Sequence, residues 1–336
     1  MSTKFQIEDP SIESQWRAII LFGKNSATYK FAFAKSLLSL VENQKTRISL
    51  SDLAIPFAES TVEHLRIYDK QGSSSGSAFL NACRDYIHDK ISQDQLHELT
   101  IKHGFNYVID AFQVVNGAMI PDKLYEKNFG SGSKEIVITD NLLKLKELFQ
   151  YRNLSHEVEA RWKLVETAWN LQINPNILEV QYDEDKSLFF IENNLMRRID
   201  ITSVRSSLNG YQKGKCFYSL HEISINPADQ NLCEVDHFLP HVNKLHHSRQ
   251  GANINGVWNL VLADSAVNLD KKAKIPEKHF LERLFNRNEY YIESKHPLAE
   301  TIINQTGNTC EKRRRFLEAH YNLALSLSIQ TWSPKL

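Results

Sequence analysis

An acidic residue and a histidine stand next to each other at Asp236-His237, near the end of an apolar, β-prone run that Pro240 terminates. Asn259 follows after a long gap, and Asn268 comes nine residues later. Carboxylate and amide oxygens are hard ligands that suit Mg²⁺ or Mn²⁺. A histidine, with an unperturbed pKa near ~6.5, can accept a proton from water at neutral pH. Because Asp-His pairs are common at strand ends on protein surfaces, only the surrounding pattern gives this pair a chemical meaning.

Two short apolar runs before the pair predict a hairpin that positions it. Residues 216–218 are expected to form its first strand and residues 233–238 its second, with Pro240 ending the pairing. Successive side chains of a strand point to opposite faces, so Asp236 and His237 are expected to project in opposite directions. One of them can then hold a metal while the other faces the attacking water.

A helix after the hairpin is expected to complete the site. Residues 239–257 form a long loop, which in a compact domain is usually functional or mobile. Asp264 or Ser265 can cap a helix that runs through Asn268. Folding this helix back onto the hairpin is expected to bring Asn268 beside Asp236.

The pattern resembles the HNH endonucleases, the ββα-metal finger family, in a form whose last triad position is asparagine (an HNN variant). The resemblance covers roughly residues 211–276, with the matched positions in the family's order. They are the lead-in at 212–218, Asp236 and His237 with Pro240, the central Asn259, and Asn268 with Lys271 three residues on. The spacing of nine between the two asparagines is similar to that of the HNH domain of CRISPR effector nucleases.

This resemblance implies metal-dependent cleavage or nicking of DNA. His237 would be the general base, and Asp236 and Asn268 would hold one Mg²⁺ or Mn²⁺ ion. Asn259 would fix the loop or the His237 ring through its amide. The family's products carry 5′-phosphate and 3′-hydroxyl ends. The helical leader also resembles those of bacterial HNH proteins of anti-phage defence, which implies a partner protein of such a system.

Two other functions fit the same residues. A non-cleaving DNA-binding or adaptor subunit, recruited by a partner ATPase, is favoured by the neutral charge and the large helical region. The presence of all four site residues argues against it. An RNA-cleaving effector also fits, because the site contacts a phosphate and not a sugar.

The cysteines argue against a structural zinc. Many members of the family brace the finger with two CxxC pairs, but Cys216 is followed by Ser219, and no cysteine stands near Asp264. A closed zinc site needs four ligands, so we expect no structural zinc and a finger held by apolar packing. The remaining cysteines, Cys83, Cys233 and Cys310, form no disulfide framework, as is typical of a reducing cytosol.

Basic side chains near the finger are candidate phosphate contacts. They are Lys271, Lys272 and Lys274 at the end of the predicted helix, and Arg313 and Arg314 in the densest basic run of the chain. A solvated helix face is the alternative for most of them. The histidines His241, His246 and His247, in the loop beside Lys244 and Arg249, could bind phosphate or a second metal, although exposed loop residues without catalytic roles are more common.

Charge and hydropathy limit how the protein can contact nucleic acid and where in the cell we expect it. Lys+Arg and Asp+Glu both number 40, so phosphate contacts must come from local patches rather than from a globally basic surface. No apolar run of ~18 residues spans a membrane, and the polar N-terminus is no signal peptide. We therefore expect a cytoplasmic protein without a membrane segment.

The periodicity predicts an α+β protein. Residues 1–200 are expected to form a mostly helical N-terminal domain, residues 201–285 the HNH ββα-metal domain, and residues 286–336 C-terminal helices.

Overall fold

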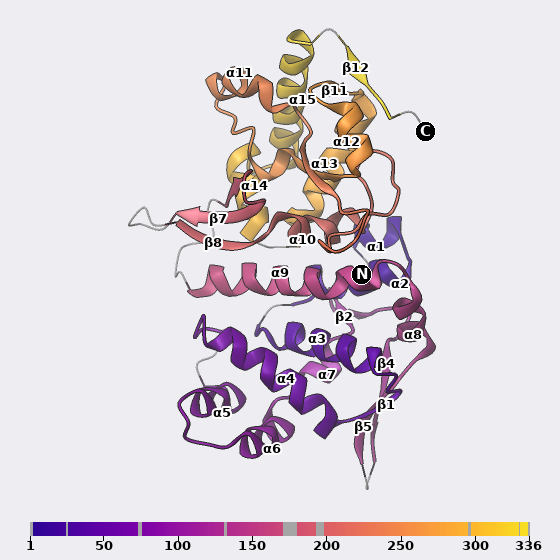
Figure 1. The fold of residues 1–336 in the computed structure, drawn as a ribbon, viewed down its shortest axis with the longest axis vertical. Coiled ribbons are helices and arrows are strands. Elements are labelled where there is room, and N and C mark those ends of the chain that lie inside the picture. The colour runs from indigo at the N-terminus through magenta and orange to yellow at the C-terminus, as the bar shows by residue number, and fades with distance from the viewer. Residues whose placement is uncertain are drawn as a thin grey trace. The chain divides into compact units, whose positions relative to one another are not determined.

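The computed structural model describes residues 3–24, 26–72, 76–130, 133–170, 180–192, 198–294, 297–328 and 330–334. The chain forms two compact units, Met1–Gln172 and Ile173–Leu336 (Figure 1). Helices predominate and the sheets are small, which confirms the α+β class. The domain limits predicted at residues 200 and 285 stay a prediction. Within the described ranges, no helix combines the length and apolarity needed to cross a membrane.

The described part of the first unit is mainly helical. Its helices are α1 (Lys4–Glu8), α2 (Ile12–Phe22), α3 (Tyr29–Glu42), α4 (Leu50–Leu65), α5 (Ala78–Ile87), α6 (Gln93–His103), α7 (Val108–Ala111), α8 (Asp140–Glu147) and α9 (Tyr151–Asn170). Ser11, Ser49, Ser77 and Ser92 each cap a helix by accepting a backbone N–H bond with the side-chain hydroxyl. These caps satisfy donors that the first turn leaves without partners.

Small antiparallel sheets accompany these helices. β1 (Arg47–Ser49), β5 (Lys134–Ile138) and β4 (Tyr125–Phe129) pair in that order. β2 (Val114–Val115) and β3 (Ala118–Met119) form a hairpin. Its turn is Asn116-Gly117, with φ of 49° and 80°, because a two-residue hairpin turn of this kind requires left-handed backbone.

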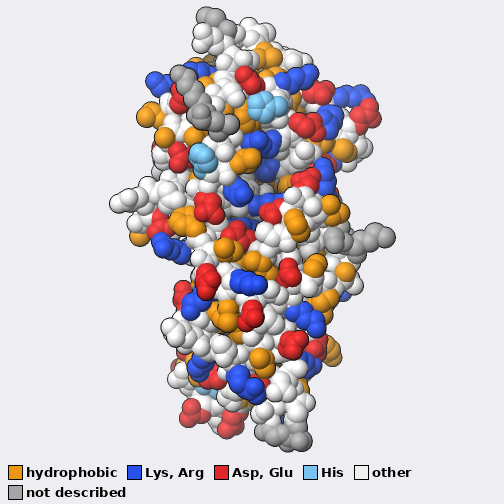
Figure 2. All heavy atoms as spheres, turned by 90° about the vertical axis from the view of Figure 1, so that its right-hand side faces the viewer, with side chains coloured by type: hydrophobic (Ala, Val, Ile, Leu, Met, Phe, Trp, Pro, Cys, Tyr) orange, Lys and Arg blue, Asp and Glu red, His pale blue; other side chains and the backbone are white. Residues whose placement is uncertain are grey.

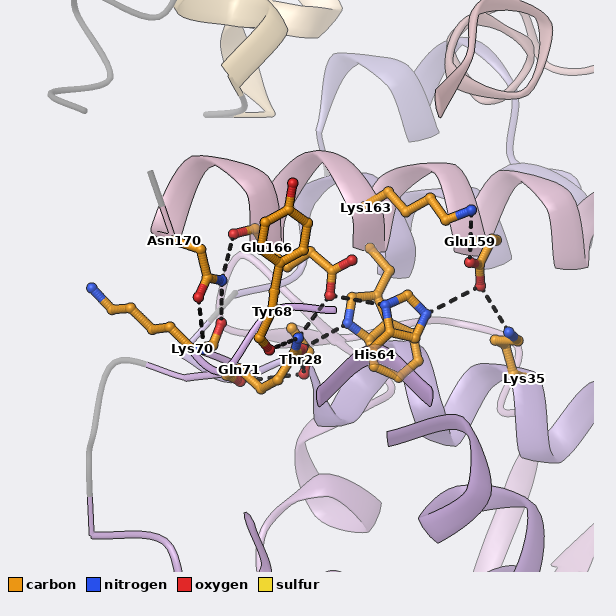
Figure 3. Close-up of polar contacts among 11 residues, drawn as sticks. Thr28, Lys35, His64, Tyr68, Lys70, Gln71, Glu159, Lys163, Glu166 and Asn170 are labelled. Carbon is orange, nitrogen blue, oxygen red and sulfur yellow. Dashed lines mark hydrogen bonds and ion pairs between the residues drawn. The ribbon is translucent and has the colours of Figure 1, made fainter. Parts of the chain in front are cut away.

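A buried polar network joins α4 to α9 (Figure 3). The ring of His64 lies between Glu166, whose Oε2 is 2.8 Å from Nδ1, and Glu159, whose Oε2 is 3.4 Å from Nε2. It stacks on Trp162 with 3.6 Å between ring centroids. Gln71 donates to Glu166 and accepts from the Trp162 indole. Burial alone would lower the pKa of His64, but the hydrogen bonds to Glu159 and Glu166 raise it above its ordinary value.

The second unit mixes short strands with helices. Its described elements are β6 (Gln181–Asp183), β7 (Leu188–Glu192), β8 (Arg198–Ser203), α10 (Val204–Asn209), η2 (Gly210–Gln212), β9 (Glu234–His237), η3 (His241–Asn243), α11 (Lys244–Arg249), η4 (Val257–Asn259), β10 (Leu260–Ala263), α12 (Ser265–Lys271), β11 (Ile275–Pro276), α13 (Lys278–Glu293), α14 (Pro297–Thr306), α15 (Cys310–Ser326) and β12 (Thr331–Trp332). β6, β7 and β8 form an antiparallel sheet, and β11 pairs with β12 in parallel.

β9 pairs with β10, so the predicted strand partner was wrong. The antiparallel register places Asp236 opposite Val261 and His237 opposite Leu260. Residues 216–218 instead lie beside β10, where the Phe217 N–H donates to the Leu262 carbonyl. All four residues of β10 are buried, so tertiary burial selects this run as the partner.

The helix after β10 begins as predicted. Asp264 is the N-cap of α12 and accepts from the Ala266 and Val267 N–H groups. β9, β10 and α12 therefore form a ββα unit in chain order. The predicted loop at 239–257 contains η3 and α11.

Candidate active site

His237 ends β9 and is 8% exposed. Its Nε2 is 2.9 Å from Asn255 Oδ1. An amide oxygen only accepts, so this contact selects the tautomer protonated at Nε2 and leaves Nδ1 as the basic nitrogen. Burial lowers the pKa of His237, against the opposing effect of the Asn255 hydrogen bond. The imidazole is therefore neutral at pH 7, as a general base must be.

Asp236 is also 8% exposed and holds two polar partners. The Tyr218 hydroxyl donates to its Oδ2 at 2.6 Å. The Lys271 ammonium lies 2.9 Å from Oδ2 and 3.1 Å from Oδ1, and it donates to the His237 carbonyl at 2.8 Å. Burial lowers the pKa of Lys271, against the attraction of Asp236. A buried ammonium thus neutralises this carboxylate.

α12 packs against β9 with two polar side chains. Asn268 Nδ2 donates to Glu234 Oε2 at 2.5 Å, while Lys271, one turn further on, contacts Asp236. Glu234 and Asp236 are two residues apart on one strand and so share a face. The structure therefore places Asn268 against Glu234 and gives the contact with Asp236 to Lys271.

Asn259 is fully buried and fixes the loop after His237. Its Oδ1 accepts from the Leu239 N–H at 2.8 Å, and its Nδ2 donates to the Leu239 and Ile254 carbonyls. Of the two roles expected for this amide, the structure shows contact with the loop. Asn255 contacts the imidazole instead.

The oxygen donors on this face are of the kind that hard cations prefer. Asp236 and Glu234 supply carboxylates, and Asn268 supplies an amide oxygen. Among the described residues, no group of three or more His, Cys, Asp or Glu side chains converges on one point. Mg²⁺ does not need such a cage, because it usually keeps several waters and uses one or two carboxylates plus substrate phosphate. The donor set therefore fits Mg²⁺ or Mn²⁺, provided that Lys271 shares or leaves the Asp236 carboxylate.

Two arginines of α13 hold the segments that carry these residues. Arg287 donates to the Leu260 carbonyl at 2.5 Å and to the Val257 and Trp258 carbonyls. One turn earlier, Arg283 donates to the Phe217 and Tyr218 carbonyls. Arg287 thus fixes the backbone on both sides of Asn259. Arg283 fixes the backbone at Tyr218, the residue whose hydroxyl donates to Asp236.

Sequence reasoning missed Asn255, Arg283, Arg287 and the role of Tyr218. Asn255 stands four residues before Asn259, a repeated asparagine spacing that was available as a signal. Arg283 lies within residues 277–285, where the apolar pattern indicates an amphipathic helix, whereas Arg287 lies beyond that pattern. Nothing in the sequence showed that they would contact carbonyls of the finger.

The cysteines of the finger are buried. The Asp264 N–H lies 3.3 Å from Cys216 Sγ, and Cys216 and Cys233 are both inaccessible to solvent. Burial raises the pKa of the Cys233 thiol to about 12. The absence of a structural zinc stays a prediction.

Most of the predicted phosphate contacts are ion-paired within the chain. The pairs are Lys271 with Asp236, Lys274 with Asp270, Arg313 with Glu289, and Arg314 with Glu282. Lys272 is exposed, with a φ of 51°. Basic and acidic side chains are interspersed over the face drawn in Figure 2. The nucleic-acid role of these five residues stays a prediction.

Residues 216–277 match the family model of the HNH endonucleases. This segment contains Asp236, His237, Asn259 and Asn268, and the match confirms the family resemblance inferred from the sequence. No curated protein and no solved structure matches the chain.

Proposed function

We propose that the second unit is a metal-dependent endonuclease that hydrolyses or nicks DNA. The proposal is carried by one observation: in a segment that matches the HNH endonucleases, a neutral, oriented His237 stands next to the carboxylate of Asp236 at the end of β9. The DNA substrate, the anti-phage context and the cytoplasmic location are parts of this proposal.

Each side chain has a distinct task in this proposal. Nδ1 of His237 accepts the proton of the attacking water, while Asn255 holds the opposite ring nitrogen. Asn259 keeps the backbone after His237 in place through three hydrogen bonds. Asp236 and Asn268 would hold one Mg²⁺ or Mn²⁺ ion, with Glu234 beside Asn268. When bound, the ion supplies positive charge to the phosphate and to the leaving oxygen.

A plasmid-cleavage assay with Mg²⁺ or Mn²⁺ tests this proposal. The wild-type protein should nick or linearise the plasmid, EDTA should stop it, and His237→Ala should lose activity by about 10²–10⁴-fold. His279→Ala is a matched control, because His279 is exposed on α13. Equal cleavage by the wild type and His237→Ala would contradict the assignment, and activity in EDTA would contradict the metal.

The interaction of Lys271 with Asp236 favours a second candidate, a DNA-binding or adaptor subunit that does not cut. Both oxygens of this carboxylate already have cationic or hydroxyl partners. Binding of DNA without cleavage in Mg²⁺, Mn²⁺ and Ni²⁺ would support this candidate. Lys271→Met distinguishes the two, because it frees Asp236 for a metal, and metal-dependent cleavage gained by this variant would show a latent nuclease site.

A further inference from the structure

The segment from the end of β9 to the end of β10 contains basic residues and no acidic ones. Residues 238–263 contain no aspartate or glutamate, although the whole chain has as many acidic as basic residues. The segment carries Lys244 and Arg249, together with three histidines. Most of these side chains lie on or beside α11, so this short helix is a positive element in a neutral protein.

The exposed side chains of this element are basic and apolar in alternation. Lys244, His246 and Arg249 are exposed. Val242 is 73% exposed and Leu245 is 72% exposed, values that are high for large apolar side chains. We call these five residues the α11 surface.

The cations of the α11 surface are not neutralised within the described chain. Neither Lys244 nor Arg249 forms an ion pair with any carboxylate that the structure describes. Arg313 and Arg314 of α15, by contrast, each bind a glutamate. Lys244 and Arg249 can therefore contact an external anion without breaking an internal pair.

Buried contacts fix α11 on α15, and the turn that leads into α11 begins beside His237. His247 is inaccessible to solvent, and its Nδ1 lies 3.0 Å from Nδ1 of His320 on α15. The His247 carbonyl also accepts from the Ala252 N–H. On the other side, the ring of His241 lies 5.3 Å from that of His237. The α11 surface is thus anchored at one side by His320 and connected at the other to the segment that contacts His237.

From this arrangement we infer that the α11 surface is where duplex DNA docks for cleavage at His237. Lys244, His246 and Arg249 contact backbone phosphates, and Val242 and Leu245 pack against sugars and base edges. Charge complementarity selects a polyanion as the occupant, because two unpaired cations lie in a segment without acidic residues. The inference rests on the proposed function, since it names the surface that holds the substrate of that site.

Salt-dependent binding to a short DNA duplex tests the inference. Binding is measured in a His237→Ala background, so that cleavage does not interfere, for the added pair Lys244→Ala/Arg249→Ala. The matched control pair is Lys215→Ala/Lys278→Ala, which removes two exposed positive charges of the same unit that lie outside the predicted phosphate contacts. The first pair should reduce the slope of log K against log salt by about 1.8 and weaken binding roughly tenfold, because each lost phosphate contact releases about 0.9 fewer counterions. The control pair should leave the slope unchanged.

The apolar residues give an independent readout. Leu245→Ser should weaken binding roughly fivefold without changing the salt slope, because it removes apolar contact and no charge. Equal melting temperatures would show that each variant is folded. Wild-type cleavage with an unchanged slope for Lys244→Ala/Arg249→Ala would overturn the α11 surface and leave the proposed function standing. Absence of both cleavage and DNA binding would overturn both, and tighter binding to an RNA duplex of the same sequence would overturn the DNA assignment.

Discussion

His64 of α4 and His237 of β9 are both buried, but the groups that surround them differ in kind. His64 lies between two carboxylates and stacks on Trp162, and its pKa is raised. The ring of His237 contacts the amide of Asn255, and burial lowers its pKa. The surroundings of the first ring favour its protonated form and tie two helices together, whereas those of the second favour the neutral form, which can accept a proton.

The two regions also differ in how their buried charges are compensated. In the α4–α9 network, glutamates face the imidazole. Beside the finger, Arg287 of α13 is 3% exposed and donates to backbone carbonyls and to the Asn288 amide oxygen. In the first region, contacts between the imidazole and two carboxylates hold two helices together. In the second, hydrogen bonds from an arginine hold irregular backbone, whose carbonyl groups have no partner within a regular helix or sheet.

Alanine substitutions at the two histidines should separate an effect on the cleavage rate from an effect on stability. His237→Ala should reduce cleavage by about 10²–10⁴-fold with little change in melting temperature. His64→Ala should lower the melting temperature while leaving the activity of the folded protein within about twofold, because His64 holds structure in the first unit. Cleavage rates and differential scanning calorimetry measure both quantities, and the reverse pattern would contradict the comparison.

Removing a carboxylate from the network should have the largest effect on stability. Glu166 is 1% exposed and accepts from Gln71 as well as contacting His64. Glu166→Ala should reduce the free energy of unfolding of the first unit by about 3–5 kcal/mol, because it removes the charged partner of the buried His64 ring and the acceptor of the Gln71 amide. Glu63→Ala, at an exposed position of α4, should change it by less than about 0.5 kcal/mol. Urea denaturation gives both values, and similar losses would show that the network carries no special weight.

Arg287→Met should destabilise the finger by about 2–4 kcal/mol, because several buried carbonyls lose their donor. Arg287→Lys should recover part of this loss, since an ammonium can still donate to one or two of them. The substitution should also lower the rate constant for cleavage at saturating DNA, because the backbone around Asn259 is then less fixed. Full stability of Arg287→Met would show that the carbonyl contacts are dispensable.

The two units should respond to pH in opposite directions. The folded pKa of His64 is raised, so its stabilisation is fully present below about pH 6.5 and is lost as pH rises through the folded pKa. Burial, followed by the nearby His320 and His246, lowers the pKa of His247 to about 4. The second unit should therefore lose up to roughly 2 kcal/mol between pH 7 and pH 5, because the unfolded state binds the proton more tightly.

Measurements of the free energy of unfolding from pH 5 to pH 9 check the direction of both pH dependences. His64→Gln should reduce the loss on the alkaline side, and His247→Asn should reduce the loss on the acidic side, to which the buried His237 also contributes. A variant that keeps the wild-type pH profile would show that its histidine does not cause the dependence.

Local patterns predicted part of the site well. Asp264 is the N-cap of α12 as expected, the ββα order is present, and the segment matches the family named from its spacing. The partner of β9 was mispredicted, because residues 216–218 and 260–263 are both short apolar runs, and only packing of the whole unit decides between them. The contacts of Asn268 and Lys271 depend on how α12 is rotated about its axis, which distant residues set. Arg287 lies outside the matched segment, so no motif indicated it.

The parallel pairing of β11 with β12 has a consequence for biosynthesis. Trp332 donates its indole N–H to Asp270, and its ring packs 5.1 Å from that of Tyr218, whose hydroxyl binds Asp236. A ribosome must therefore release the chain beyond Trp332 before these contacts to the carboxylate site can form. A nascent chain whose Trp332 is still in the exit tunnel lacks these contacts, so the surroundings of the Asp236 carboxylate are completed only after Trp332 has emerged from the ribosome.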